Sequence, residues 1–529
     1  MATQSTNFPG HGYGNVYIDS LLWGCGWTGG AVTYSFGAGA VAAGDSDIGA
    51  FTGADWSDRE KAAFTRALAN YSEVCSLQFV ASESQAEANI VWWLAPAAAL
   101  GRNTLGMHDV PDEGRAQAYG YFGWQQASWS YLEAGGDGYV TIIHELGHGM
   151  GLAHPHDGGG EDDATRFPGV STPWRTGTNA MNQGIWTTMS YNDGWSVAPP
   201  KSLAYGNQTT LMALDIAALQ AQYGANMTTR TGDDVYVLPT ANQSGTGWSC
   251  IWDAGGADTI SNAGSAAACV INLNAAPLVG ANAGGYVSRG AGVIGGFTIA
   301  NGVVVENATG GSGNDNLTGN AADNRLDGGG GFDAMAGGGG DDTYIVDNTR
   351  DSVTEQASEG NDTVYSSVTF TLKSEIETLV LTGTGNIGGT GNNAANLLMG
   401  NQGNNSLNGS GGDDLLDGGA GADRLTGGAG ADIFRFEVGD TGVGSKGRDT
   451  ITDFKYAQGD RIDLRAIDAN ELIEGMQTFT LVAGKAFTGH AGELVFSRSV
   501  LSADTDGDGL ADFELQLTGV SSFSMGLLL

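Results

Sequence analysis

Hydrophobic residues recur at helical spacing in three segments of the first 228 residues. The stretch DWSDREKAAFTRALANYSEVC predicts an amphipathic helix over residues 57–74, with Asp55 or Ser57 available to cap its start. A second helix is expected around HELGHGMGLAH (144–154), and LMALDIAALQAQYG predicts a third that ends at Gly224. Between the first two helices, SLQFV (76–80) and NIVWW (89–93) are apolar and rich in β-forming residues, so they predict strands. Residues 1–228 therefore predict one domain that mixes α and β structure.

The pattern changes after about residue 229, where glycine, asparagine and aspartate become frequent and helical spacing disappears. Nine-residue units of the form G-G-x-G-x-D-x-U-x follow, in one block at 310–345 and a second at 391–435. Six turn residues use glycine for left-handed backbone angles, and the last three form a short strand whose apolar residue points inward. We expect an all-β parallel β-roll over 229–445. The strand-like segments DTITDF, GDRIDL and FELQLTG predict a capping β-region over 446–529.

Stacked turns would bring the aspartates of successive repeats close together. Calcium would offset their repulsion and accept backbone carbonyls as further ligands, whereas a calcium-free Gly- and Asp-rich stretch has too little apolar surface to order itself. A flexible linker is the alternative, but the nine-residue phase is held across four and then five units, which favours the roll. The predicted calcium ligands are the fourth and sixth residues of six repeats: Gly313 and Asp315, Gly331 and Asp333, Gly340 and Asp342, Gly412 and Asp414, Gly421 and Asp423, Gly430 and Asp432.

The segment DTDGDGLAD (504–512) has aspartates at positions 1, 3 and 5 of an EF-hand loop and Gly509 at position 6. Position 12 is Leu515, which cannot supply the bidentate carboxylate that an EF-hand requires. A polar turn is therefore favoured over an EF-hand.

Charge narrows the possible partners. Lysine and arginine total 22 against 59 acidic residues, and the formal net charge is −37. The few basic residues do not cluster, which argues against nucleic acid or an anionic membrane and favours cations. We expect no membrane span, because no run of about 18 apolar residues occurs, and the first residues contain no readable signal peptide. Four cysteines are too few for a disulfide scaffold, and their spacing leaves pairing open.

The segment 144–154 carries the candidate chemistry. His144 and His148 lie at i and i+4 on one helix face, so both imidazoles can reach one ion. Gly151 lets the chain leave the helix, so that His154 can return as a third nitrogen donor. Three neutral imidazoles leave zinc an open position for water, whose pKa falls to about 7, and Glu145 is placed to take its proton. This chemistry hydrolyses peptide bonds.

The specificity of this motif comes from its length, because HExxH alone arises by chance on ordinary helices. The continuation GxxH is more specific, and TTMSYND (187–193) adds Met189 in a polar turn with Tyr191 two residues on. A core methionine and a packed aromatic residue are the alternative interpretations of this pair.

HELGHGMGLAHP, the turn TMSY, the helix DIAALQAQYG and the nonapeptide repeats together resemble the serralysins, the metzincin branch of bacterial secreted zinc proteases. The resemblance implies an α+β metzincin-type protease domain, followed by the parallel β-roll (RTX) and its cap. It implies zinc ligands at His144, His148 and His154, Glu145 as general base and then acid, and Met189 beneath the metal. Tyr191 would be a further zinc ligand that swings away to hydrogen-bond the oxyanion.

The same resemblance implies a substrate, an export route and a location. A protein or peptide substrate would add to an edge strand by main-chain hydrogen bonds, and the strand around 89–93 resembles that edge. The family leaves the cytosol through a type I exporter that reads a C-terminal signal, here SFSMGLLL. We therefore expect a secreted, extracellular, monomeric enzyme, with a propeptide possible before Ile18.

Two other classes of protein share part of this pattern. A calcium-binding surface-layer or adhesion protein would use the repeats but would have no need of Glu145. A repeat-bearing lipase would require a G-x-S-x-G elbow, and the sequence contains none.

Overall fold

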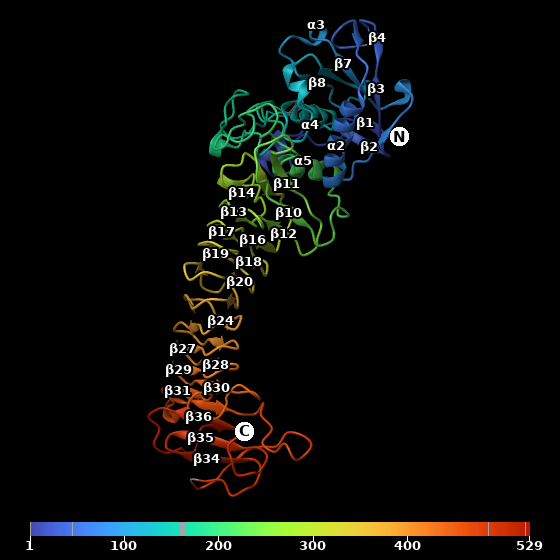
Figure 1. Cartoon of the computed structure of the whole chain (residues 1–529). Coiled ribbons are helices and arrows are strands. Elements are labelled where there is room, and N and C mark those ends of the chain that lie inside the picture. Colours follow the sequence, from blue (N-terminus) through green and yellow to red (C-terminus); the bar gives the residue numbers. More distant parts are fainter. Residues whose placement is uncertain (1, 45, 159–163, 485, 524) are drawn as a thin grey trace. The chain divides into compact units, whose positions relative to one another are not determined.

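The computed structural model describes residues 2–44, 46–158, 164–484, 486–523 and 525–529 (Figure 1). The chain divides into two compact units, one formed by Met1–Asn262 and Cys269–Val305 and the other by Ala263–Ala268 and Glu306–Leu529. The predicted domain border at residue 228 does not coincide with this division. The three-part organisation at 1–228, 229–445 and 446–529 stays a prediction.

A five-stranded sheet and three main helices organise the first unit. The sheet has the order β6 (Phe79–Ala81), β3 (Val32–Gly37), β7 (Ile90–Ala95), β9 (Ala118–Gly123) and β8 (Gly106–His108). The strands run parallel except β8, which is antiparallel to β9. The helices are α2 (Asp58–Val74), α4 (Asp137–Gly149) and α5 (Ala213–Tyr223), with the short α1 (Val16–Ser20) and α3 (Ala97–Leu100).

Helix α2 begins where the sequence predicts. Ser57 is its N-cap, and Ser57 and Glu60 form a reciprocal capping box that satisfies two exposed backbone donors. The face with Phe64, Leu68 and Tyr71 is buried. The Tyr71 hydroxyl donates to the Ile143 carbonyl at 2.6 Å, which ties α2 to α4.

The prediction that residues 89–93 form the edge strand of the sheet is wrong. β7 pairs with β3 on one side and with β9 on the other, so it lies inside the sheet. Every residue of β7 is buried, as expected of a strand covered on both faces. The last strand in the sheet order on this side is β8, whose residues were not predicted to form a strand.

Short strands complete the first unit. β1 (Ala2–Ser5) pairs with β2 (Gly26–Gly29), and β4 (Gly39–Val41) pairs with β5 (Phe51–Gly53). Further along the chain, β10 (Val235–Val237) pairs with β12 (Thr259–Ser261), β11 (Trp248–Ile251) with β15 (Gly296–Ile299), and β13 (Cys269–Asn272) with β14 (Arg289–Gly290).

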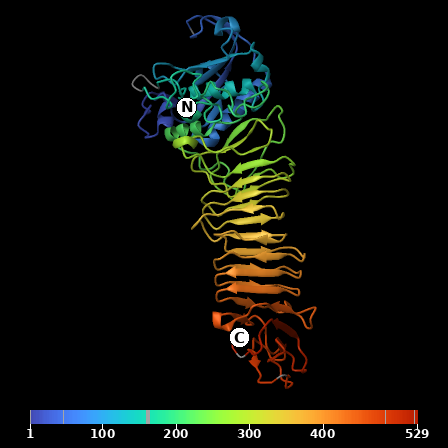
Figure 2. The same cartoon turned by 90° about the vertical axis from the view of Figure 1, so that its left-hand side faces the viewer.

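The second unit is a parallel β-roll, as predicted, and Figure 2 shows its strands stacked as yellow and orange arrows. One sheet contains β16 (Asn307–Thr309), β18 (Arg325–Asp327), β20 (Thr343–Val346), β22 (Thr363–Ser366), β24 (Thr378–Leu381), β26 (Leu397–Met399), β28 (Leu415–Asp417), β30 (Ile433–Arg435), β32 (Arg461–Asp463) and β37 (Leu527–Leu528). Successive nonapeptides alternate between opposite sheets. The opposite strands are β17 (Asn316–Thr318), β19 (Ala334–Ala336) and β21 (Ser352–Val353), then β23 (Phe370–Thr371), β25 (Gly388–Thr390), β27 (Ser406–Gly411), β29 (Arg424–Ala429) and β31 (Asp449–Ile451).

Stacked apolar side chains fill the roll. Leu326 pairs in register with Tyr344 and Tyr344 with Val364, and later Leu398 pairs with Leu416. All five side chains are fully buried. The apolar residue at position eight of each repeat therefore points inward, as the nine-residue pattern predicts.

The end of the chain forms the cap. β36 (Phe513–Leu517) continues the roll beside β31, then pairs antiparallel with β35 (Val500–Asp504), which pairs antiparallel with β34 (Glu493–Ser497); β33 (Thr480–Leu481) lies beyond. In the segment 504–512, the two carboxylate oxygens of Asp504 accept from Gly507 N and Gly509 N at 2.6 and 2.9 Å. These bonds form a turn in which Asp504, Asp506 and Asp512 also lie close enough together to share an ion. The preference for a polar turn over an EF-hand stays a prediction.

All four cysteines, Cys25, Cys75, Cys250 and Cys269, are buried. Among the described residues, no helix combines the length and the apolar character that a membrane crossing requires.

Candidate metal centres

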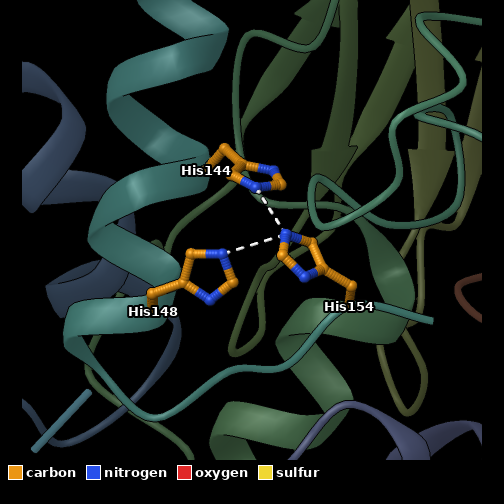
Figure 3. A group of neighbouring side chains, drawn as sticks. All are labelled: His144, His148 and His154. Carbon is orange, nitrogen blue, oxygen red and sulfur yellow. Dashed lines mark hydrogen bonds between the residues drawn. The ribbon is translucent and has the colours of Figure 1, made fainter. Parts of the chain in front are cut away.

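Helix α4 and the turn after it bring three histidines together (Figure 3). His144 and His148 lie one turn apart on α4, with Ile142, Ile143 and Leu146 fully buried around them. Gly151 has φ of 94°, and a Cβ there would lie 2.2 Å from the Cys25 carbonyl oxygen. Only glycine fits this turn, which directs His154 back toward the helix.

The ring nitrogens of the histidines converge. His154 Nε2 lies 3.1 Å from His144 Nε2 and 3.0 Å from His148 Nε2. His144 Nδ1 lies 2.8 Å from the Thr188 carbonyl oxygen, and His148 Nδ1 lies 2.8 Å from that of Leu152. His154 Nδ1 lies 2.5 Å from Asp157 Oδ2. Because carbonyl and carboxylate oxygens accept, each Nδ1 carries the proton, and each Nε2 of a neutral ring presents a bare lone pair.

Such a group suits a zinc ion. The His154 lone pair lies about 3 Å from each of the other two, and lone pairs this close repel one another unless a cation lies between them. Zinc bonds to nitrogen of about 2.0–2.1 Å place tetrahedral ligands about 3.3 Å apart. Protons are a poor alternative, because burial lowers the pKa of His144 to about 3 and that of His148 well below its usual value. The donor set therefore fits the predicted metal.

Glu145 lies beside the histidines but is not one of the three grouped donors. It is buried, and desolvation raises its pKa to about 8. A Cβ on Gly106 would lie 2.5 Å from Glu145 Cγ, so strand β8 passes directly against this side chain. A carboxyl group held in an apolar setting beside a metal site is suited to accept and return a proton.

Tyr191 and Met189 both lie close to the histidine group. The Tyr191 ring centroid is 4.6 Å from that of His154 and 5.6 Å from that of His144, and the residue is 39% exposed. Desolvation, with a contribution from the charge of Glu145, raises its pKa to about 12, so the phenol stays protonated as a donor. Met189 is fully buried, and a Cβ on Gly147 would lie 2.6 Å from its sulfur.

Asp215 supports the site from the start of α5, a role that the sequence did not reveal. Its carboxylate accepts from Thr187 Oγ1 at 2.6 Å, Thr188 N at 2.7 Å and Met212 N at 3.0 Å. Asp215 therefore fixes the turn whose Thr188 carbonyl accepts the His144 Nδ1 proton. Two other missed residues, Asp157 and His156, directly follow the motif; the His156 ring stacks on His154 at 4.9 Å.

The roll places all six predicted aspartates in buried positions, in stacks that repeat every 18 residues. In each stack, one carboxylate oxygen accepts the backbone N–H of the preceding turn: Asp333 from Asp315, Asp342 from Asn324, Asp414 from Asn396, Asp423 from Asn405, and Asp432 from Asp414. In these five aspartates the second oxygen is buried without a hydrogen-bond partner among the described residues. A buried unpaired carboxylate oxygen is costly unless a cation contacts it.

The predicted glycines shape these turns. Gly331, Gly340, Gly412, Gly421 and Gly430 have φ between 104° and 148°. A Cβ on Gly331 would lie 1.9 Å from the Gly313 carbonyl oxygen, so only glycine allows the turns to stack this closely. Burial raises the pKa of Asp414 and Asp423 to about 7. Carbonyls and carboxylates packed this way suit calcium, which prefers oxygen ligands.

Repeats with asparagine at position six differ from those with aspartate. Asn324 Oδ1 accepts from Asn320 N at 2.7 Å, and its Nδ2 donates to the Glu306 carbonyl at 3.1 Å. Asn405 makes the equivalent bonds to Asn401 N and the Ile387 carbonyl, at 2.8 and 3.0 Å. These amides satisfy both of their polar atoms without an ion.

Two further aspartates have the arrangement of the predicted ones but fall outside the consensus. Asp362 accepts from Asp342 N at 2.9 Å, and Asp449 accepts from Asp423 N at 2.6 Å. Their other oxygens are buried and unpartnered within the described residues. The signal available in the sequence was a G-x-D triplet, GND at 360–362 and GRD at 447–449. In the first unit, Asp234, Asp253 and Asp258 form another acidic group.

Comparison with known proteins bears on both units. The family described as peptidase M10 serralysin C terminal matches residues 225–365 and 357–528, more than half of the chain. The metalloprotease AprA of Pseudomonas entomophila is 32% identical over 286 residues, which cover 48% of this chain and 55% of that protein. Serralysin C of Dickeya chrysanthemi is 35% identical over 221 residues, covering 38% and 42%. The chain thus spans about half the length of the curated relatives it matches.

The chain also resembles parts of solved structures. The AlgE6R3 subunit of the Azotobacter vinelandii mannuronan C5-epimerase is 28% identical and covers 30% of this chain and 82% of that one. Its TM-score is 0.19, too low to show a shared fold.

Proposed function

Because this chain belongs to the serralysin family, we propose that it is a secreted zinc-dependent endopeptidase with a calcium-dependent β-roll. The observation that carries the peptidase proposal is the convergence of three Nε2 atoms, with that of His154 at 3.1 and 3.0 Å from those of His144 and His148, and with Glu145 and Tyr191 beside them. His144, His148 and His154 would hold the zinc ion, and Tyr191 would be an additional ligand in the resting enzyme.

Bound zinc would supply Lewis acidity toward water and the peptide carbonyl. Glu145 would take the proton of the attacking water and then deliver it to the leaving amine, so that the peptide bond breaks as the new carboxyl group forms. The Tyr191 hydroxyl would donate a hydrogen bond to the substrate's carbonyl oxygen as this atom becomes an oxyanion. Asp157 and the Thr188 and Leu152 carbonyls would hold the three imidazole rings in the tautomer that presents Nε2.

Strand β8 is the proposed binding edge for an extended peptide. It lies at the end of the sheet order, and Gly106 at its start lies against Glu145. A peptide that pairs with β8 by main-chain hydrogen bonds would pass the Glu145 carboxylate. Such pairing gives affinity without strong sequence selection.

The roll is proposed to take up calcium outside the cell after export by a type I system. Ion binding to sites that exist only when turns are stacked would stabilise the folded roll by mass action. The apolar tail proposed as the export signal ends in β37, which pairs with β32; its Ser524 lies outside the described residues.

Metal analysis and a casein-cleavage assay on one preparation test the peptidase proposal. The parent should contain about one zinc and lose activity on chelation. Glu145→Gln should retain the zinc but lose nearly all cleavage, because the ligands stay while the base is removed. Glu133→Gln, an exposed glutamate of the same unit, is the control and should cleave at the parental rate. Casein cleavage by Glu145→Gln near the parental rate would contradict the assignment, and a parent that holds zinc but cleaves nothing would favour a binding protein.

A further inference from the structure

Three buried carboxyl groups meet where the chain leaves the nonapeptide spacing. Asp342 is the sixth residue of the fourth repeat and directly precedes β20, and Asp362 directly precedes β22. Glu355 follows β21, within the irregular segment 347–361 that separates these strands. The exposed fractions of Asp342, Glu355 and Asp362 are only 1%, 7% and 1%.

Each of these residues uses one oxygen for a backbone donor. Asp342 Oδ1 accepts from Asn324 N at 2.7 Å, and Asp362 Oδ1 accepts from Asp342 N at 2.9 Å. Glu355 Oε1 accepts from Gly337 N at 3.3 Å, a donor shared with the Tyr344 hydroxyl oxygen at 2.6 Å. These bonds fix the orientation of all three carboxyl groups.

The remaining oxygens have no partner in the described part of the chain. They are Asp342 Oδ2, Glu355 Oε2 and Asp362 Oδ2, all buried. Each residue offers one donor atom to a group whose atoms lie within 4.8 Å of one another. No ion pair joins these carboxylates to a lysine or arginine among the described residues. Burial raises the pKa of Asp342 to about 7 and that of Glu355 to about 8, and the charge of Asp362 contributes to both shifts. Burial, with the charges of Glu377, Asp341 and Glu359, raises the pKa of Asp362 to about 6.

We propose that the consensus aspartate Asp342 combines with Glu355 and Asp362, which lie outside the nonapeptide consensus, to form a calcium site that binds its ion more tightly than the consensus sites. All three donors are oxygens, which excludes a preference for zinc or copper. The three oxygens lie within 4.8 Å of one another, a separation that calcium can span with oxygen bonds of about 2.3–2.6 Å. Calcium is also the ion that accepts carboxylates from several segments in a flexible geometry, whereas magnesium demands a near-ideal octahedron.

The tighter binding follows from the number of charges. A consensus turn offers one or two buried carboxylates together with carbonyls, whereas this site offers three carboxylates from three segments. Calcium affinity rises with the charge of the ligand set and with the rigidity of the site. The ion would also attach the irregular segment to the roll through Glu355. The inference extends the calcium part of the proposed function and is independent of the peptidase.

Calcium counting on the full-length protein tests the site. Glu355→Gln keeps the size of the side chain but removes its charge, and Glu375→Gln removes an exposed charge from the same unit as the control. Each protein is dialysed against buffers of decreasing free calcium and analysed for bound calcium. The parent and Glu375→Gln should retain one ion after the others have left. Glu355→Gln should lose that ion at about tenfold or more higher free calcium.

A second measurement keeps the test decisive if Glu355→Gln folds poorly. Terbium replaces calcium, and an excited tyrosine nearby sensitises its emission. The Tyr344 hydroxyl lies at the site, so Tyr344→Phe should lose the component of sensitised emission that saturates first, while its calcium count stays at the parental value.

The outcomes separate the two proposals. Loss of the tightest ion in Glu355→Gln, or of the first emission component in Tyr344→Phe, supports the site. An unchanged count and affinity in Glu355→Gln would overturn the site and leave the roll's calcium binding intact. A parent that retains no calcium at all would overturn the site together with the calcium part of the proposed function.

Discussion

Replacing Asp414 by asparagine should make the stability of the roll less dependent on calcium. Asp414 Oδ1 accepts the Asn396 N–H at 2.8 Å, and its Oδ2 is buried without a hydrogen-bond partner. Burial, reinforced by the charge of Asp432, raises the pKa of Asp414 from 3.8 to about 7. The amide in Asp414→Asn keeps the first bond through its oxygen and removes the buried charge.

The size of the effect follows from linkage. A folded-state pKa above the unfolded value means that this carboxyl group favours the folded state below about pH 4, and that this contribution is lost as the pH rises through about 7. A shift of about three pKa units corresponds to about 4 kcal/mol at pH 8 in chelator. Free calcium at about 100 times the Kd of the site stabilises the folded parent by about 2.7 kcal/mol. The free energy of unfolding of Asp414→Asn should therefore exceed that of the parent by about 4 kcal/mol in chelator and by about 1 kcal/mol in calcium.

Hydrogen exchange on the full-length protein measures this difference locally. Amides of β26 to β30 should exchange more slowly in Asp414→Asn than in the parent in chelator at pH 8, and the gap should shrink in about 10 mM calcium. Asp413→Asn is the matched control, because Asp413 is exposed and its Oδ1 accepts Ala431 N at 2.8 Å, a bond that asparagine retains. The control should change stability by less than about 0.5 kcal/mol. The predicted linkage to calcium would be refuted if the exchange rates of Asp414→Asn and the parent differed equally in chelator and in calcium. It would also be refuted if Asp414→Asn exchanged faster than the parent in chelator.

Other predictions concern the zinc site. Tyr191→Phe should lower kcat by about a hundredfold and raise KM far less, because the phenol acts mainly on the transition state; a change in KM alone in steady-state assays would make it a substrate-binding residue. Asp157→Asn should weaken zinc binding by about 10–100-fold in competition with a chelating dye, since it removes the charge that accepts from His154 Nδ1, and unchanged affinity would show that this contact is dispensable. Asp215→Ala should lower the free energy of unfolding by about 3–5 kcal/mol, because three buried donors lose their acceptor; a loss under 1 kcal/mol in thermal unfolding of the full chain would show that the turn does not need it.

Local patterns explain what the sequence predicted well. Helix α2 was expected at 57–74 and is found at Asp58–Val74, since its cap and its apolar spacing are both local signals. The grouping of His144, His148 and His154 depends on an i, i+4 pair and one glycine turn, all within eleven residues. The inward position of one apolar residue per repeat likewise follows from a nine-residue period.

Long-range pairing explains what the sequence left out. NIVWW was taken for an edge strand by resemblance, although an uninterrupted apolar run is typical of a strand buried on both faces. Asp215 contacts Thr187 and Thr188, which lie 27 to 28 residues earlier in the chain, and no local pattern encodes that distance. Asp362 and Asp449 join their stacks at separations of 20 and 26 residues, so a search in steps of nine misses them.

The reactivity of the four buried cysteines depends on local unfolding of the first unit. Desolvation raises the pKa of Cys25, Cys75 and Cys250 to about 12, so almost no thiolate exists while they are covered. Only a thiol that becomes exposed reacts quickly with an alkylating reagent, because the thiolate is the nucleophile. Since all four lie in the first unit, the order in which they are alkylated would record which of its parts open first, without any introduced label.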